Sequence, residues 1–193
     1  MDAVVPCGRW ALRHQIGDPA RLSPLRVHNL YVIAIRRSTA DDAPFMQEML
    51  AVAVGWRPGS RLRSIAEVMA APELARYVAD WPRMDDIGFV ATDGATDVGA
   101  VWWRFFPQHD CGYGFVDDQT PELSIGVVHE ARRSGVGSLL LRTLIEEALR
   151  SGLPALSLSV EPDNPAASLY ERLGFEPVPS SGGALTMLLR MRS

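Results

Sequence analysis

Residues 122–138 read ELSIGVVHEARRSGVGS, an apolar run that is followed by a basic, glycine-rich segment. The run from Glu122 to Val128 has the apolar, β-branched character that is typical of a strand. Residues 135–150 then carry apolar side chains at helical spacing. The pattern therefore predicts a strand, a loop and a helix in direct succession, with two glycines where the helix begins.

The loop has the chemistry of a phosphate site. A helix N-terminus offers unpaired N–H groups and partial positive charge. Gly135 and Gly137 lack side chains, so a pyrophosphate can approach the backbone there. Arg132 and Arg133 add fixed positive charge, although they could also be plain surface charges. Ser138 either contributes its N–H or hydroxyl to the phosphate or caps the helix.

Two familiar nucleotide loops do not fit this stretch. The P-loop needs a Gly-Lys-Ser/Thr sequence, and the chain contains no Lys. The dinucleotide fingerprint needs a third glycine where Leu140 stands.

The rest of the chain predicts strands and helices arranged around this loop. We expect strands near 31–36, 87–92, 98–106, 122–128, 156–160, 175–179 and 184–191, and helices near 39–53, 64–80, 135–150 and 164–174. The order β-α-α-β-β-β-α-β-α-β-β mixes hairpins with crossovers. We therefore expect an α/β fold, a single domain over 31–193 with a mixed, mostly antiparallel sheet flanked by helices. Residues 1–30 show little pattern and are interpreted as an N-terminal extension.

Two motifs carry a resemblance to a known family. Arg132, Gly135 and Gly137 are similar to the Q/R-x-x-G-x-G/A loop of the GNAT N-acetyltransferases. The segment from Asn164 through Tyr170 to Phe175 resembles the family's N-x-x-A-x-x-x-Y-x-x-x-G-F segment. The resemblance implies the acyl-CoA N-acyltransferase fold.

The resemblance also implies acetyl-CoA as the cosubstrate. In that family the loop holds the CoA pyrophosphate, and the end of the preceding strand pairs with the pantetheine arm like an added strand. The Asn contacts the pantetheine region. The binding residues implied here are Ile125, Val127, Val128, Arg132, Arg133, Ser134, Gly135, Val136, Gly137, Ser138 and Asn164. No metal is expected, because the four His have no metal-ligand spacing.

Two side chains are candidates for the chemistry of acetyl transfer. Tyr170 is the candidate acid that protonates the leaving thiolate, although its place on an apolar helix face also fits plain packing. Glu122 is the candidate base, acting through water, although it could be a solvated glutamate at a strand end. Strand alternation puts Glu122 on the face opposite Leu123 and Ile125.

The resulting hypothesis is an N-acetyltransferase that moves acetyl from acetyl-CoA to a primary amine of a small molecule or peptide in a ternary complex. A non-catalytic acyl-CoA-binding sensor on the same fold is the alternative. Another acyl donor or an O-linked acceptor is a third reading. The loop at 107–121 and the segment at 54–83 are expected to select the acceptor, and they carry no recognisable code.

The composition excludes other classes of protein. A net charge of −4 does not suit nucleic-acid binding, and no apolar stretch has the length of a membrane span. Cys7 and Cys111 lack the spacing of a metal or redox site, so we expect a reduced, cytoplasmic protein. All 19 basic residues are Arg, which is typical of a GC-rich, bacterial genome. A homodimer is suggested by the resemblance alone.

Overall fold

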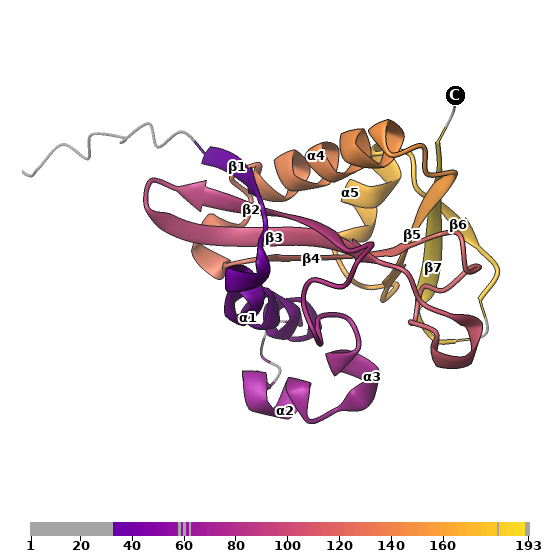
Figure 1. The fold of residues 1–193 in the computed structure, drawn as a ribbon, viewed down its shortest axis with the longest axis horizontal. Coiled ribbons are helices and arrows are strands. Elements are labelled where there is room, and N and C mark those ends of the chain that lie inside the picture. Colours follow the sequence, from indigo (N-terminus) through magenta and orange to yellow (C-terminus); the bar gives the residue numbers. More distant parts are fainter. Residues whose placement is uncertain (1–32, 58, 60, 62, 181, 192–193) are drawn as a thin grey trace, which may run out of the picture. The chain divides into compact units, whose positions relative to one another are not determined.

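The computed structural model describes residues 33–191 except 58, 60, 62 and 181. Its seven strands form one sheet in the order β1-β2-β3-β4-β5-β7-β6 (Figure 1). Only β4 and β5 run parallel, and the other neighbours are antiparallel. The strands are β1 Ile33–Arg37, β2 Ile87–Asp93, β3 Thr96–Arg104, β4 Glu122–Val127, β5 Ala155–Val160, β6 Glu176–Val178 and β7 Leu185–Arg190. The predicted mixed, mostly antiparallel sheet is therefore confirmed.

Helices cover both faces of this sheet. Figure 1 shows α4 and α5 on one side and α1, α2 and α3 on the other. The helices are α1 Ala43–Val54, α2 Ile65–Met69, α3 Pro72–Ala75, α4 Val136–Arg150 and α5 Ala167–Arg172, with 3₁₀ turns η2 Ala40–Asp42, η3 Gln108–Asp110 and η4 His129–Ala131. The N-terminal extension predicted for residues 1–30 lies outside the described residues.

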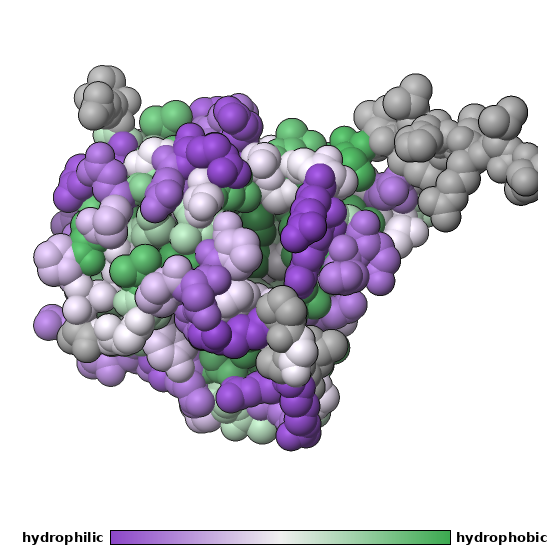
Figure 2. Space-filling model, turned by 180° about the vertical axis from the view of Figure 1, so that it is seen from behind, coloured by the Kyte–Doolittle hydropathy of each residue, from purple (hydrophilic) through white to green (hydrophobic). Residues whose placement is uncertain are grey.

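The hydrophobic core consists of two layers, one on each side of the sheet. Trp103 and Leu123 pack with the α4 and α5 side chains, whereas Trp102 and Ala100 pack with those of α1 to α3. Successive strand residues point to opposite faces, which is why the two adjacent tryptophans belong to different layers. On the face drawn in Figure 2, hydrophobic residues are interspersed with hydrophilic ones.

The predicted helix over 64–80 is wrong in its extent. Two short helices, α2 and α3, replace it, and residues 76–80 form turns. The break falls at Ala71, which is extended (φ −97°, ψ 104°) and precedes Pro72. A residue before proline is disfavoured in helical geometry, so the chain must restart its helix at the proline.

Two further boundaries differ from the prediction. The strand expected over 98–106 begins at Thr96 and ends at Arg104. The helix expected to open at Asn164 begins only at Ala167. Asn164 instead forms a turn, because its Oδ1 accepts from the Ala166 N–H at 2.9 Å and its carbonyl accepts from the Ala167 N–H at 3.0 Å.

Candidate functional site

Strands β4 and β5 separate soon after they begin. The register joins them at one pair, Glu122 with Ser157, where the Ser157 N–H donates to the Pro121 carbonyl at 3.0 Å. On its other edge, β4 pairs with β3 along its whole length. Alternate residues of a strand direct their backbone groups to the same neighbour, so those of Ile125 and Val127 face the gap beside β5. The sheet therefore offers backbone groups of β4 that a ligand can pair with.

The end of β4 is partly occupied by the protein itself. Arg132 donates from Nε to the Val127 carbonyl at 3.1 Å, and the Val128 N–H donates to the Val98 carbonyl at 3.0 Å. Of the three residues predicted to pair with pantetheine, Ile125 and Val127 thus face the gap, and the Val128 N–H is used within the sheet. Arg132 fixes the strand end, which is a role that its position in the motif did not reveal.

The predicted phosphate loop forms the start of α4. Gly135 is its N-cap with φ +93°, a left-handed conformation that favours glycine. Arg133 is also left-handed, with φ +62°, and Ser134 Oγ donates to the Ala131 carbonyl at 2.7 Å. The first N–H groups of a helix have no intrahelical acceptor, so those of residues 136–138 are available to an anion. Because the N-cap is Gly135, the capping role considered for Ser138 is wrong.

Gly137 is not required by packing. A Cβ built on this residue would meet Leu169, Val127 and Ile125 at 3.8–4.0 Å, which are ordinary contacts. The fold would therefore accept alanine at this position. A ligand that lies against the backbone is a sufficient physical reason for the missing side chain.

Glu122 lies at the bridge between β4 and β5 and is only 3% exposed. Tyr77 Oη donates to its Oε1 at 2.9 Å, and its Oε2 is buried and has no hydrogen-bond partner among the described residues. Burial raises the pKa of Glu122 to about 7, against the opposing effects of the Tyr77 hydrogen bond and, more weakly, of the Gly114 backbone N–H. The alternative of a solvated glutamate is therefore wrong, and the carboxyl can exchange a proton near neutral pH.

Tyr170 lies on the other face of the sheet, in the layer with α4. Its ring packs edge-to-face on Phe175, with 5.9 Å between ring centroids. Burial raises the pKa of Tyr170 to about 12, so the phenol stays protonated at neutral pH. Packing and proton donation are therefore compatible. Since Glu122 faces Tyr77 in the opposite layer, a group that passes between β4 and β5 has the Glu122 carboxyl on one side and the Tyr170 phenol on the other.

The second motif departs from the family pattern in its spacing. Only five residues separate Asn164 from Tyr170, one fewer than in the N-x-x-A-x-x-x-Y pattern. The side-chain oxygen of Asn164 is used by the local turn. Its amide nitrogen is left as the group that can donate to a ligand.

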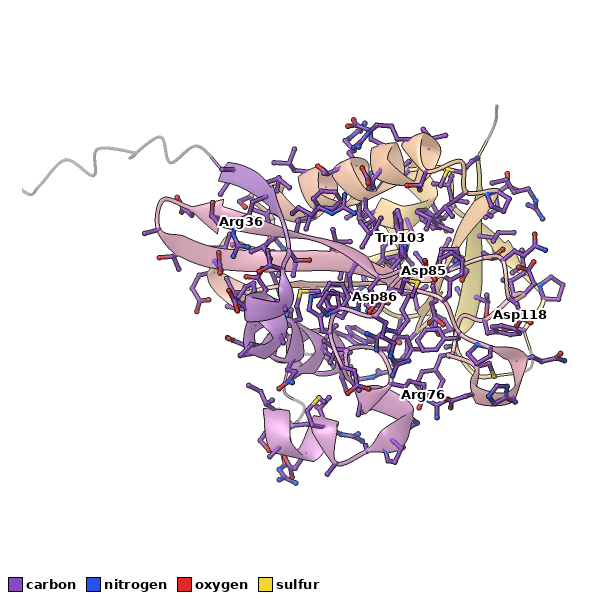
Figure 3. The ribbon with its side chains drawn as sticks, viewed as in Figure 1. Arg36, Arg76, Asp85, Asp86, Trp103 and Asp118 are labelled. Atoms are coloured by element: carbon purple, nitrogen blue, oxygen red, sulfur yellow. The ribbon has the colours of Figure 1, made fainter. Side chains whose placement is uncertain are left out.

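A small hollow of about 240 Å³ lies close to Glu122. It is lined by Glu73, Arg76, Cys111, Gly112 and Tyr113. A Cβ built on Gly112 would overlap Glu122 Oε2, so this oxygen lies directly beneath the hollow's wall. Figure 3 shows Arg76 beside α3. Sequence reasoning placed the acceptor-selecting segments at 54–83 and 107–121, and this hollow lies between parts of both.

A larger hollow of about 500 Å³ lies elsewhere, beside Asp85, Asp86, Trp103 and Asp118 (Figure 3). The Asp118 carboxylate accepts from the Gln108 N–H at 3.0 Å, so it stabilises the loop to which both residues belong.

Within the described residues, no group of His, Cys, Asp and Glu side chains is placed to hold a metal ion. No helix among those residues is long and apolar enough to cross a membrane.

The family model for the acetyltransferase (GNAT) family matches residues 60–175. The chain belongs to this family. Solved structures share the GNAT fold: PaiA N-acetyltransferase from Thermoplasma acidophilum in complex with coenzyme A has a TM-score of 0.60, 18% identity, and coverage of 83% of this chain and 99% of that one. The ribosomal-protein-S18-alanine N-acetyltransferase from Escherichia coli has a TM-score of 0.56, 23% identity, and coverage of 84% and 97%. The predicted fold and family are thus confirmed.

Curated GNAT relatives are mycothiol acetyltransferases. That of Actinosynnema mirum is 30% identical over 173 residues, which are 82% of this chain and 55% of the relative. That of Pseudarthrobacter chlorophenolicus is 36% identical over 104 residues, which are 52% of this chain and 30% of the relative. The chain therefore spans about half the length of the Actinosynnema protein and less than a third of the Pseudarthrobacter protein. At the level of the family, these matches support the predicted class of enzyme, an acyl-CoA-dependent N-acetyltransferase.

Proposed function

We propose that the protein transfers an acetyl group from acetyl-CoA to a primary amine of a small molecule or peptide, directly, in a ternary complex. The observation that carries the proposal is the buried Glu122 carboxyl, whose pKa of about 7 suits a general base. It lies where β4 and β5 separate, and the loop before α4 follows the same strand.

The donor would bind along the strand–loop–helix unit. The backbone of Ile125 and Val127 would pair with the pantetheine arm, and the N–H groups of residues 136–138 would hold the pyrophosphate. Arg132 and Arg133 would add positive charge at the same loop, where both are exposed. Asn164 would donate its amide to the pantetheine region. The solved relative that contains coenzyme A supports CoA as the ligand class.

The chemistry requires the removal of two protons from the acceptor nitrogen, the addition of one proton to the leaving thiolate, and one exchange of bonds. Glu122 takes a proton from the acceptor ammonium through a bridging water, which leaves a neutral amine. The amine nitrogen attacks the thioester carbonyl carbon and the C–N bond forms. The C–S bond breaks as the tetrahedral intermediate collapses, and the nitrogen loses its second proton to solvent, as Glu122 does the proton that it took. Tyr170 gives its proton to the leaving thiolate and is later reprotonated from solvent. The products are an N-acetyl amide and CoA.

The amine class of acceptor is supported by the relatives. The curated relatives are named mycothiol acetyltransferases, and one solved relative is named a ribosomal-protein-S18-alanine N-acetyltransferase. We infer an amine acceptor for this chain and leave its skeleton open. The cytoplasmic location and the homodimer stay predictions.

A thermal-shift and turnover experiment tests the proposal. A ligand present at about a hundred times its Kd stabilises the folded state by roughly 2.7 kcal/mol. We expect acetyl-CoA and CoA to raise the Tm and ATP to leave it unchanged. Thiol release is then followed with an amine panel and with acetyl, propionyl and longer acyl donors. A Tm shift without turnover on any amine would favour the acyl-CoA sensor, and no shift would refute both readings.

A further inference from the structure

Tyr77 connects Glu122 to the loop that follows β3. Its hydroxyl donates to Glu122 Oε1 at 2.9 Å and accepts from the Tyr113 backbone N–H at 2.6 Å. Burial raises the pKa of Tyr77 above its usual range, so the hydroxyl keeps its single proton. The Tyr77 hydroxyl oxygen therefore connects the buried Glu122 carboxyl to Tyr113, which lines the 240 Å³ hollow.

The Tyr77 ring is held from several directions. It packs edge-on against Phe106 with 5.0 Å between centroids, and it stacks on the Tyr113 ring at 6.3 Å. The Trp102 Nε1–H donates to the Tyr77 carbonyl at 2.9 Å, which fixes the backbone as well. A hydroxyl on a side chain held in this way has little freedom to reorient, so its hydrogen bonds are preorganised.

No charged side chain among the described residues pairs with Glu122, and the Gly114 backbone N–H affects its pKa less than the Tyr77 hydroxyl does. Arg104 of β3 lies across from it in the register but is bonded to Asp86. Arg76 pairs with Asp110 and donates to the Cys111 carbonyl. On β5 the neighbour is the neutral Ser157, and the α1 residues buried in the adjacent layer are uncharged. The Tyr77 hydroxyl is thus the side-chain group that directly orients this carboxyl.

We propose that Tyr77 is a positioning residue that holds Glu122 Oε1, leaves Oε2 as the proton-accepting atom, and joins the carboxyl to the backbone at Tyr113. The inference rests on the proposed function for the role of Glu122 as the base. Among the described residues Oε2 has no hydrogen-bond partner, and it lies directly under Gly112, which lines the hollow. A molecule seated in the hollow would disturb the Gly112–Tyr113 backbone and, through Tyr77, the carboxyl.

The first test leaves Tyr77 in place. The Glu122 carboxyl carbon and the Tyr113 amide are followed by NMR across a pH titration of the ligand-free protein. We expect both signals to change with one midpoint, because the two groups share the Tyr77 oxygen. Glu122→Gln serves as the control and should abolish the titration of the Tyr113 amide near that midpoint. A Tyr113 amide that ignores the titration of Glu122 would overturn the inference.

The second test removes the hydroxyl. In Tyr77→Phe, the pKa of Glu122 should rise by on the order of 1 unit, because the bond that favours the charged form is lost. The acid limb of kcat/KM should move to higher pH by the same amount, while the KM for acetyl-CoA stays unchanged. Phe106→Leu is the matched control, since it loosens the same ring without touching the hydroxyl.

The outcomes separate the possible roles. A lower Tm in both variants, with the Glu122 titration of Tyr77→Phe identical to that of the wild type, would reduce Tyr77 to a packing residue and overturn the inference. A raised Glu122 pKa in a protein that acetylates no amine would uphold the positioning role and refute the proposed function instead.

Discussion

Arg104 and Glu122 lie directly across from each other on β3 and β4, yet Arg104 binds Asp86 and not Glu122. The Arg104 and Asp86 side chains are 1% and 2% exposed. The guanidinium also donates to the carbonyls of Arg76 and Ala79, at 2.6 and 2.9 Å. The arginine therefore ties the segment after α3 to the sheet, and no cation of the described part of the chain pairs with the Glu122 carboxyl.

This arrangement predicts a large loss of stability in Asp86→Asn. The change leaves the buried Arg104 charge without its partner, which costs about 3–5 kcal/mol. Urea unfolding measures the difference. Asp85→Asn is the matched control, because Asp85 is exposed and its observed bond uses the backbone carbonyl. Similar stabilities for the two variants would contradict the structural role of the pair.

Glu122→Gln should abolish most of the turnover. Loss of a general base typically lowers the rate by a factor of about 10² to 10⁴, and the acid limb of the pH profile should disappear with it. Steady-state kinetics across pH measure both effects. Glu130→Gln removes an exposed carboxyl after the same strand and should behave as the wild type. An unchanged acid limb in Glu122→Gln would assign that limb to another group.

The same carboxyl should make the stability depend on pH. The pKa of Glu122 rises from 4.5 to about 7 on folding, so the folded state favours the protonated form. Stability is therefore highest below about pH 4 for this group and falls as pH rises to about 7, by an amount of about 3 kcal/mol at most. We expect Glu122→Gln to gain stability over the wild type at pH 8 and not at pH 4. Parallel slopes for the two proteins would contradict the burial of the charge.

Tyr170→Phe separates proton donation from packing. The ring contact with Phe175 survives the change, whereas the proton for the thiolate is lost. With acetyl-CoA we expect kcat to fall by roughly 10²-fold, within the range of acid catalysis. An acetyl thioester of an acidic aryl thiol needs no such proton and should lose far less. Equal losses with both donors would indicate that the hydroxyl plays no part as an acid.

The two glycines of the loop should respond differently to alanine. Gly137→Ala fits the space available and should leave the Tm unchanged, while CoA affinity falls because the new methyl lies at the proposed pyrophosphate site. Gly135→Ala forces a left-handed conformation and should cost about 1 kcal/mol of stability in the absence of ligand. Calorimetric titration with CoA and thermal unfolding measure the two effects. Unchanged affinity in Gly137→Ala would place the phosphate elsewhere.

The fold could be predicted from the sequence because each helix or strand is indicated by a pattern within its own residues. The apolar period of 135–150 and the run beginning at Glu122 each specify one element, and their order limits the topology. The face of Glu122 followed from alternation alone. The break before Pro72 could also have been predicted from local sequence, since the residue before a proline disfavours helical geometry.

The partners of Glu122 could not be predicted in this way. Tyr77 lies 45 residues from Glu122 in the chain and was counted only as part of a helical stretch. Its bond depends on how the turn after α3 packs on the sheet, which no periodicity describes. Arg104 likewise fits a strand end equally well as an exposed charge or as a buried anchor. Gly112 allows its loop to pack directly on the Glu122 carboxylate, because a side chain there would overlap Oε2. Its neighbours in the sequence do not distinguish it from an ordinary turn glycine.

The single bridge between β4 and β5 has a consequence for how the sheet holds together. Strands β1 to β4 form one continuous set of hydrogen bonds, and β5, β7 and β6 form another. Besides the direct contact between β4 and β5, α4 joins the two sets, because it packs against strands of both. The helix whose first turn would bind the phosphate is thus also an element that connects the two sets of strands. If the donor binds there as proposed, its binding should stabilise the contact between the two sets of strands, and the cooperativity of unfolding should rise with donor concentration.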